Sequence, residues 1–317
     1  MAVELEEGSI PADALEALRV DASLPICLAC GTQYPVARTD CPICEDPRQF
    51  VPPSGQAWTT LADLSSNRKH TLLPDKEDKR VTFIQTIPGF GIDQTPTLIE
   101  TGSGSYIWDC AALLTPHLIS YLKSLKTPLR AIAISHPHFF STSLTWARAL
   151  QVPLYICEDD KPWFQRLSDV SEGEIKWWRG KQELGPGVTV IQCGGHFEGS
   201  AILHWDRLSE PAPPVDDLPT SPTPVSGLIL TADTIMVQRT QKRFTFLWSA
   251  PNMIPLNPTD VVGIWNRVKT FPFSQATSSW PGRFIRSDAK SVLEESVREY
   301  LKAMGWEWDG ENSFVPL

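Results

Sequence analysis

Four cysteines arranged as two pairs constrain this chain more than any other feature. Cys27 and Cys30 form a C-x2-C pair, and Cys41 and Cys44 form a second pair after an interval of ten residues. Each pair can present two thiolates to one ion from a single tight turn, and two such turns complete a tetrahedral sulfur shell. Because a closed shell leaves no position open for a substrate, we expect a structural zinc site of the zinc-ribbon or rubredoxin-like knuckle type. The alternative is four free thiols that cluster without a metal.

The rest of the sequence favours metal ligation over disulfides. The chain of 317 residues starts with an acidic amphipathic stretch rather than an apolar export signal, and it has no apolar run as long as a membrane span. We therefore expect a cytoplasmic protein whose seven cysteines stay reduced. The net charge of -9 disfavours nucleic-acid and membrane partners. A small-molecule substrate is then the expected partner, and the oligomeric state is not predicted.

The order of the patterns predicts two regions. Residues 1–56 are predicted to hold a short helix and the four-cysteine knuckle, and residues 57–317 a larger domain. In the larger domain, apolar runs bounded by turn residues alternate with helical patterns, which indicates a mixed α/β or layered α+β fold. A proline-rich, acidic stretch near 209–226 is predicted to be a disordered surface insertion.

A second group of candidate ligands is spread over three segments. His136 and His138 follow the apolar strand pattern LRAIAIS, and in an extended segment two side chains at this spacing point to the same side. His196 lies in the glycine-rich stretch CGGHFEGS, and Asp233 ends another apolar strand pattern. Three imidazoles with one position left to water are typical of catalytic zinc sites. We therefore predict a second metal site formed by these segments.

These segments, in this order, resemble the metallo-β-lactamase fold superfamily over roughly residues 57–317, and Asp109 in IWDC matches an aspartate of the family pattern. The resemblance implies an αββα sandwich behind the four-cysteine segment. It also implies that the active-site ion is held at four positions, with the last in the place of the family's bridging aspartate: His136, His138, His196 and Asp233.

The chain departs from the family pattern at the positions of a second metal ion. The motif H-x-H-x-D-H continues here with Phe140 and Ser141, and Trp280 stands near the place of the last histidine. Three ligands of a second ion are therefore missing from the pattern. We expect a single ion at this site, in an outlying branch of the superfamily.

The predicted function is that of a metal-dependent hydrolase. One zinc ion lowers the pKa of its bound water toward about 7 and polarises a carbonyl, which suits an ester, thioester, lactone or amide. Asp233 and His196 are the predicted catalytic residues. The weaker candidates for substrate contact are Arg283, Arg286, Trp280 and Phe140. Two alternatives stay open: an inactive metal-binding scaffold of the same fold, and a redox enzyme with iron, or another divalent ion, at the histidine site.

Overall fold

Two β-sheets packed face to face form the centre of the protein in the computed structural model, which describes residues 3–4, 11–209 and 227–317. The first sheet has eight strands, which in spatial order are β1 (Val3–Glu4), β4 (Lys69–Pro74), β5 (Val81–Ile87), β6 (Thr97–Glu100), β7 (Ser105–Trp108), β8 (Leu129–Ala133), β9 (Leu154–Cys157) and β10 (Ile175–Trp178). The second has six, which are β11 (Lys181–Gly185), β12 (Val188–Gln192), β13 (Ala201–Trp205), β14 (Leu228–Thr231), β19 (Gln275–Ser278) and β20 (Phe284–Ile285).

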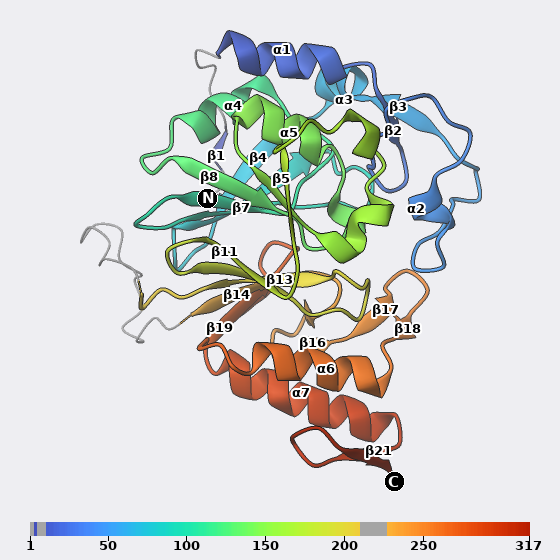
Figure 1. The fold of residues 1–317 in the computed structure, drawn as a ribbon, viewed down its shortest axis with the longest axis vertical. Helices are drawn as coiled ribbons and strands as arrows, with labels where there is room; N and C mark the ends of the chain where they lie inside the picture. The colour runs from blue at the N-terminus through green and yellow to red at the C-terminus, as the bar shows by residue number, and fades with distance from the viewer. Residues whose placement is uncertain (1–2, 5–10, 210–226) are drawn as a thin grey trace.

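Helices cover the outer face of each sheet (Figure 1). Those on the eight-stranded sheet are α1 (Ala12–Asp21), α4 (Pro116–Lys123) and α5 (Ser143–Leu150). Those on the six-stranded sheet are α6 (Pro258–Val268) and α7 (Ala289–Ala303). The αββα sandwich that the resemblance to the metallo-β-lactamase superfamily implies is therefore confirmed, and the four-cysteine segment precedes it.

Shorter elements complete the described chain. The remaining helices are α2 (Pro42–Glu45) and α3 (Leu61–Asn67), with 3-10 turns η1 (Pro137–Phe139), η2 (Glu158–Trp163) and η3 (Leu167–Asp169). The two-stranded sheets pair β2 (Pro25–Cys27) with β3 (Trp58–Thr60), β15 (Met236–Val237) with β16 (Phe244–Thr245), β17 (Leu247–Ser249) with β18 (Ile254–Pro255), and β21 (Trp306–Trp308) with β22 (Phe314–Pro316).

Side chains alternate between two cores along the central strands. In β7, Ile107 packs toward the helices, whereas Tyr106 and Trp108 lie in the core between the two sheets. In β14, Ile229 packs toward the helices, and its neighbours on either side lie between the sheets. Because successive residues of a strand point to opposite faces, a strand covered on both faces needs an apolar residue at every position. This explains the continuous apolar runs in the sequence.

One edge of the sandwich collects the strand ends that carry the candidate ligands. β7, β8 and β9 are parallel neighbours, so the residues that follow them meet at the same edge. The turn between β12 and β13 and the end of β14 lie at one end of the second sheet, because β13 runs antiparallel to both strands. The fold therefore brings together four residues from distant segments: Asp109, His136, His196 and Asp233.

The N-terminal segment packs along the sandwich. β1 pairs with β4 in the large sheet, β2 pairs with β3, and α1 contacts α5. The β2–β3 pairing joins residues on both sides of the boundary predicted after residue 56, and the division into 1–56 and 57–317 stays a prediction. Nearly all of the insertion predicted near 209–226 lies outside the described residues, so its disorder also stays a prediction.

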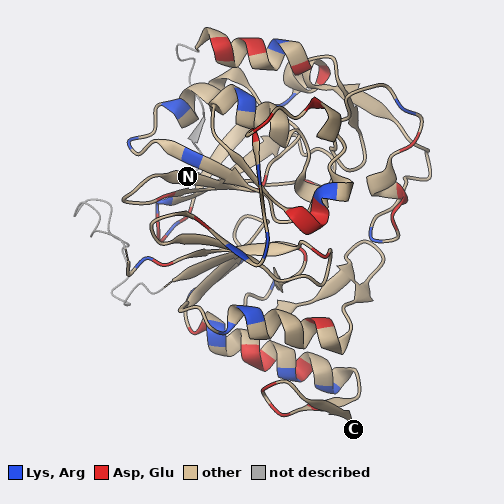
Figure 2. Ribbon diagram, in the orientation of Figure 1, with Lys and Arg blue, Asp and Glu red and all other residues tan. Residues whose placement is uncertain are grey.

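Acidic and basic residues are interspersed along the outer helices α1, α6 and α7 (Figure 2). Within the described part of the chain, none of the helices has the length and apolar character needed to cross a lipid bilayer. The predicted cytoplasmic location and the predicted choice of partner stay predictions.

Replacing the buried His70 by leucine is expected to make the fold less sensitive to acid. The ring is 3% exposed, and burial lowers its pKa to about 3. An unfolded histidine has a pKa of about 6.5, so the unfolded chain binds a proton at this residue below that pH. The native protein binds the same proton only when the pH falls to about 3, which favours the unfolded state between these pH values. Between pH 7 and pH 5 this group should lower the wild-type free energy of unfolding by about 2 kcal/mol. Urea unfolding at both pH values measures the loss, and an equal loss in His70→Leu would contradict the prediction.

Candidate metal centres

The four cysteine sulfurs converge, as their spacing predicts. Cys27 Sγ lies 3.6 Å from Cys44 Sγ, and Cys30 Sγ lies 3.6 Å from Cys41 Sγ. Zinc–sulfur bonds of about 2.3 Å in a tetrahedron place neighbouring sulfurs about 3.8 Å apart. The spacing therefore fits one ion, and all four side chains are buried.

Each cysteine pair lies in a tight turn. The N–H of Gly31 donates to the carbonyl of Cys27, and the N–H of Cys44 donates to the carbonyl of Cys41, both at 2.9 Å. Gly31 has a φ of 80°, which a residue without a side chain adopts most easily. Burial raises the pKa of the Cys30 thiol. Four thiolates can share this buried space only with a cation that offsets their charge.

Four other donor atoms surround a point at the edge of the sandwich. Asp233 Oδ2 lies 3.4 Å from His136 Nε2, 3.8 Å from His138 Nδ1 and 3.7 Å from His196 Nε2. The last two nitrogens are 3.1 Å apart. Bonds of about 2.0–2.1 Å from zinc to nitrogen or oxygen give tetrahedral edges of about 3.4 Å. The four side chains that the sequence singles out therefore meet at the spacing of one ion.

In both His136 and His196, Nδ1 contacts a group outside the cluster, so that Nε2 of the same ring faces the cluster. The Nδ1–H of His196 donates to the carbonyl of Leu247 at 3.2 Å, which leaves the lone pair of Nε2 toward the cluster. Ser135 Oγ lies 2.8 Å from Nδ1 of His136. Within the described residues, His136 Nε2 and Asp233 Oδ1 are buried without a hydrogen-bond partner. Such atoms are rare in proteins, and a bound cation with its water would satisfy them.

His138, His196 and Asp233 favour the protonation states that a cation requires. Burial lowers the pKa of His138 to about 4 and the pKa of His196 well below its ordinary value. Burial by itself raises the pKa of Asp233, but the three neighbouring histidines hold that pKa well below its ordinary value. Neutral imidazoles and an ionised carboxylate are the metal-binding forms of these groups.

The route by which His136 and His138 meet differs from the prediction. The chain enters the 3-10 turn η1 directly after His136, so the two residues do not lie on one extended segment. The rings converge by presenting different atoms, Nε2 of His136 and Nδ1 of His138. The predicted i and i+2 strand geometry is therefore wrong, although both imidazoles reach the same point.

Phe140 and Ser141, which stand where the family pattern has ligands for a second ion, do not face the histidine cluster but contact other parts of the protein. Phe140 is buried in the core and packs edge-on against Phe164, with 5.2 Å between the ring centres. Ser141 Oγ donates to the carbonyl of Gly31 in the four-cysteine segment. Core side chains enclose the ring of Phe140, which counts against a substrate contact there, and that contact stays a prediction.

The other three residues predicted to contact substrate lie at opposite ends of the second sheet. Trp280 and Arg283 lie in the turn between β19 and β20, at the same end of the sheet as the histidine cluster, and Arg283 stacks over the indole at 4.6 Å. Arg286 follows β20, which runs back toward the opposite end, and it binds both oxygens of Asp75 at 2.7 and 2.8 Å. The pairing with Asp75 counts against a substrate contact at Arg286, and the predicted contacts at Arg286, Trp280 and Arg283 all stay predictions.

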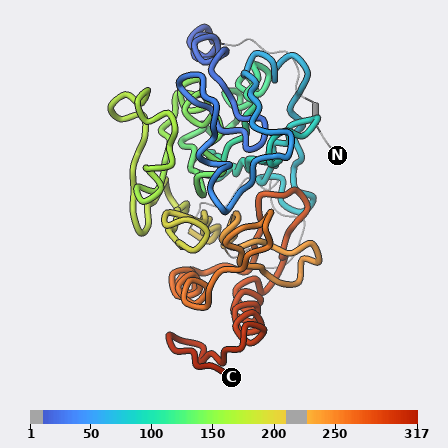
Figure 3. Tube along the Cα trace, turned by 90° about the vertical axis from the view of Figure 1, so that its right-hand side faces the viewer, coloured from blue at the N-terminus to red at the C-terminus, as the bar shows by residue number. Residues whose placement is uncertain are grey.

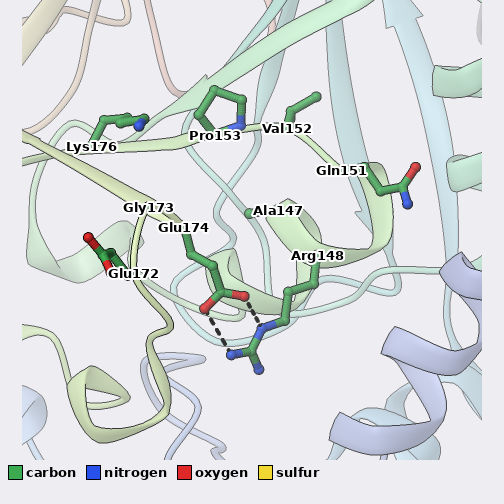
Figure 4. Close-up of a pocket in the computed structure, with 9 residues that line it drawn as sticks. All are labelled: Ala147, Arg148, Gln151, Val152, Pro153, Glu172, Gly173, Glu174 and Lys176. Atoms are coloured by element: carbon green, nitrogen blue, oxygen red, sulfur yellow. Dashed lines mark hydrogen bonds and ion pairs between the residues drawn. The ribbon is translucent and has the colours of Figure 1, made fainter.

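A surface pocket of about 470 Å³ lies beside the end of α5 and the start of β10. Figure 4 shows its most prominent charge, Arg148, turned toward Glu174. The two side chains form bonds of 2.8 and 3.1 Å, so the guanidinium already has its counter-ion. The residues that line this pocket belong to neither cluster, and it has no part in the proposed chemistry.

Two buried residues next to the clusters were missed by reading the sequence. Gln94 donates to the carbonyls of Cys30 and His138, and Arg48 donates to the carbonyl of His196. An isolated glutamine in a loop carries no signal of such a role. For Arg48, the position shortly after the second cysteine pair was the one available hint.

Comparison with known proteins gives one strong match in sequence and weaker ones in structure. No protein-family model matches the chain. The chain is 35% identical over 288 residues to the uncharacterized protein YmaE from Bacillus subtilis (strain 168), a match that covers 89% of this chain and 97% of that protein.

Solved structures align with lower similarity. A metallo-beta-lactamase from Pontibacter korlensis gives a TM-score of 0.46 at 12% identity, over 71% of this chain and 97% of that one. A metallo-beta-lactamase from Hirschia baltica gives 0.46 at 15% identity, over 71% and 96%. The metal-soaked flavodiiron core of Flv1 from Synechocystis sp. PCC6803 gives 0.49 at 12% identity, over 75% and 63%.

Proposed function

Because the chain belongs to the family of the uncharacterized protein YmaE from Bacillus subtilis, we propose its function from the chemistry of its own histidine cluster. The protein is a hydrolase that uses one zinc ion, held by His136, His138 and His196, on an ester, thioester, lactone or amide. The observation that carries this proposal is the set of four buried donor atoms at the spacing of one tetrahedral ion. The cysteine cluster holds a second, structural zinc ion.

In this proposal the three histidines bind the metal ion, and Asp233 accepts the proton. A zinc ion here would supply a water whose pKa is lowered to about 7, and an electrophile for a carbonyl oxygen. The three imidazoles hold that ion, and their burial keeps bulk water out. Asp233 has the most exposed of the four side chains, at 8%, and its Oδ1 lacks a hydrogen-bond partner among the described residues. We assign to this oxygen the role of orienting a water molecule and accepting its proton.

A carbonyl substrate suits this site better than a phosphodiester. Two-ion sites cleave phosphodiesters by stabilising both the attacking and the leaving oxygen. Phe140 and Ser141, at the positions where a second ion would find ligands, pack into the core and against Gly31. The leaving oxygen of a phosphodiester would therefore lack its cation.

A closed metal site without turnover is the second candidate, and one observation favours it. Asp233 Oδ2 stands at the fourth vertex beside the three imidazole nitrogens. A four-coordinate ion then has no open position unless Asp233 moves or the coordination expands to five. Both candidates predict the same metal content, so only turnover separates them.

Zinc-loaded wild-type protein is expected to hydrolyse members of a panel of esters, thioesters, lactones and amides. His136→Ala should lower kcat/KM by roughly 10³-fold or more, because the water and the carbonyl lose their activation together. Initial rates across the panel measure the effect, and His117→Ala, on α4 and outside the cluster, is the matched control. Wild-type protein that carries metal but turns over no panel member, or equal rates in His136→Ala, would favour the closed site instead.

A further inference from the structure

Two side chains connect the cysteine cluster with the histidine cluster, and Gln94 is the more direct of them. It lies in the loop between β5 and β6 and is 3% exposed. Its Nε2 donates one hydrogen bond to the carbonyl of Cys30 at 2.6 Å and another to the carbonyl of His138 at 3.0 Å. A single amide group therefore fixes the backbone of one ligand residue of each cluster relative to the other.

Arg48 forms the second connection, from the chain that follows the second cysteine pair. Its Nη1 donates to the carbonyl of His196 at 3.0 Å, and its guanidinium lies 3.7 Å over the ring of Phe197. Nε and Nη2 bind the two oxygens of Asp46 at 2.7 and 3.0 Å. Through Arg48, this ion pair is hydrogen-bonded to the turn that carries His196. Because the charges of Arg48 and Asp46 cancel, the pair adds almost no net charge near that turn.

The chain around Arg48 is itself held in place by the hairpin of β17 and β18. Ser249 Oγ donates to the carbonyl of Arg48 at 3.0 Å, and Asn252 Nδ2 donates to the carbonyls of the residues on either side at 3.1 Å. The same hairpin supplies the carbonyl of Leu247 that binds the ring of His196. In Figure 3 the blue N-terminal segment reaches the orange loops near residue 250.

We propose that Gln94 and Arg48 are positioning residues, through which the folded four-cysteine segment sets the backbone of His138 and His196 and thereby the metal affinity of the histidine cluster. The inference rests on metal binding at the proposed site and not on hydrolysis there. Metal ligands must be held within about 0.5 Å of their working positions, and contacts behind them change affinity by about 10- to 100-fold. Because Gln94 and Arg48 contact the backbone rather than the rings, the effect should lie at the lower end.

Gln94→Met is expected to weaken cobalt(II) binding at the histidine cluster about tenfold and to leave the cysteine cluster filled. Methionine has nearly the same volume and no hydrogen-bond donor. In a cobalt titration of metal-free protein, the sulfur-to-cobalt absorption and the visible bands that grow with it report the cysteines. Visible absorption that grows without sulfur-to-cobalt absorption reports the histidines. Gln275→Met is the matched control, since Gln275 also makes two side-chain hydrogen bonds but lies at the opposite end of β19 from the site.

Two variants of the Arg48 ion pair separate positioning from electrostatics. Arg48→Met leaves the carboxylate of Asp46 without its counter-ion, and this negative charge should attract a cation. The same variant removes the hydrogen bond to the carbonyl of His196. The double variant Asp46→Asn/Arg48→Met removes the pair without changing the net charge. Positioning predicts cobalt affinity about tenfold lower in both variants, whereas electrostatics alone predicts tighter binding in the first. The matched control is Asp40→Asn/Arg38→Met, another pair of the same segment with a bond of 2.8 Å.

The outcomes distinguish this inference from the proposed function. Wild-type protein that binds cobalt only through its thiolates would overturn both. Unchanged cobalt affinity in Gln94→Met, or an equal loss in Gln275→Met, would overturn the inference and leave the hydrolase standing. Should Gln94→Met fail to fold, Asn252→Ala decides the matter, because this exposed side chain anchors the Arg48 segment and touches neither cluster. It should weaken histidine-site cobalt binding severalfold, and wild-type affinity would count against the inference.

Discussion

Wild-type protein is expected to purify with about two metal ions per chain, and His196→Ala with about one. The two sets of donors are separate, and each lies at the spacing of a single tetrahedral ion. Removing His196 takes one imidazole from a buried set of four donors and opens the space behind it to water. An ion left with two imidazoles and one carboxylate should be lost during exhaustive dialysis. Elemental analysis of the dialysed proteins measures the stoichiometry.

A thiol-blocking reagent assigns the ion that remains in the variant. It should release that ion from His196→Ala and leave the protein metal-free, because only the four thiolates still bind tightly. His204→Ala is the control, since this buried histidine hydrogen-bonds to the carbonyl of Pro272 and belongs to neither cluster. About one ion in both wild type and His196→Ala would refute the histidine centre and leave the cysteine cluster as the metal site.

The cysteine site was predictable because its geometry is local. Two short turns, each closed by a backbone hydrogen bond, decide where the sulfurs of Cys27, Cys30, Cys41 and Cys44 point. The spacing in the sequence therefore carries nearly all the information. The convergence of the histidines needed more, because three segments far apart in sequence meet only through the parallel order of β7, β8 and β9 and the pairing around β14. Resemblance to a known family supplied that topology.

The predictions that the structure counts against concern the orientation of side chains within the tertiary structure. Arg286 stands three residues after Arg283, yet the short strand β20 carries it to Asp75 at the other end of the sheet. Phe140 follows His138 by two residues, but the turn η1 directs its ring into the core. Pro281-Gly282 marks the reversal and Pro137 begins the turn η1, but neither signal tells which way the side chains that follow will point. The contacts of Gln94 were hidden for the same reason, since a glutamine acquires a role only from the carbonyls that the fold places beside it.

Cys27→Ser is expected to lower the free energy of unfolding by about 5 kcal/mol or more in zinc-containing buffer. Each factor of ten between the free zinc concentration and the dissociation constant adds about 1.4 kcal/mol to the folded state, and structural zinc sites bind with about 10–16 kcal/mol. The loss should spread, because β2 pairs with β3 and the four-cysteine segment contacts the histidine cluster through Gln94 and Arg48. Urea unfolding at a series of buffered zinc concentrations measures it, with Cys157→Ser, a buried thiol outside the cluster, as the matched control. The control should lose about 1–2 kcal/mol at every zinc concentration, whereas wild-type stability that does not respond to zinc would show that the sulfurs hold no structural ion.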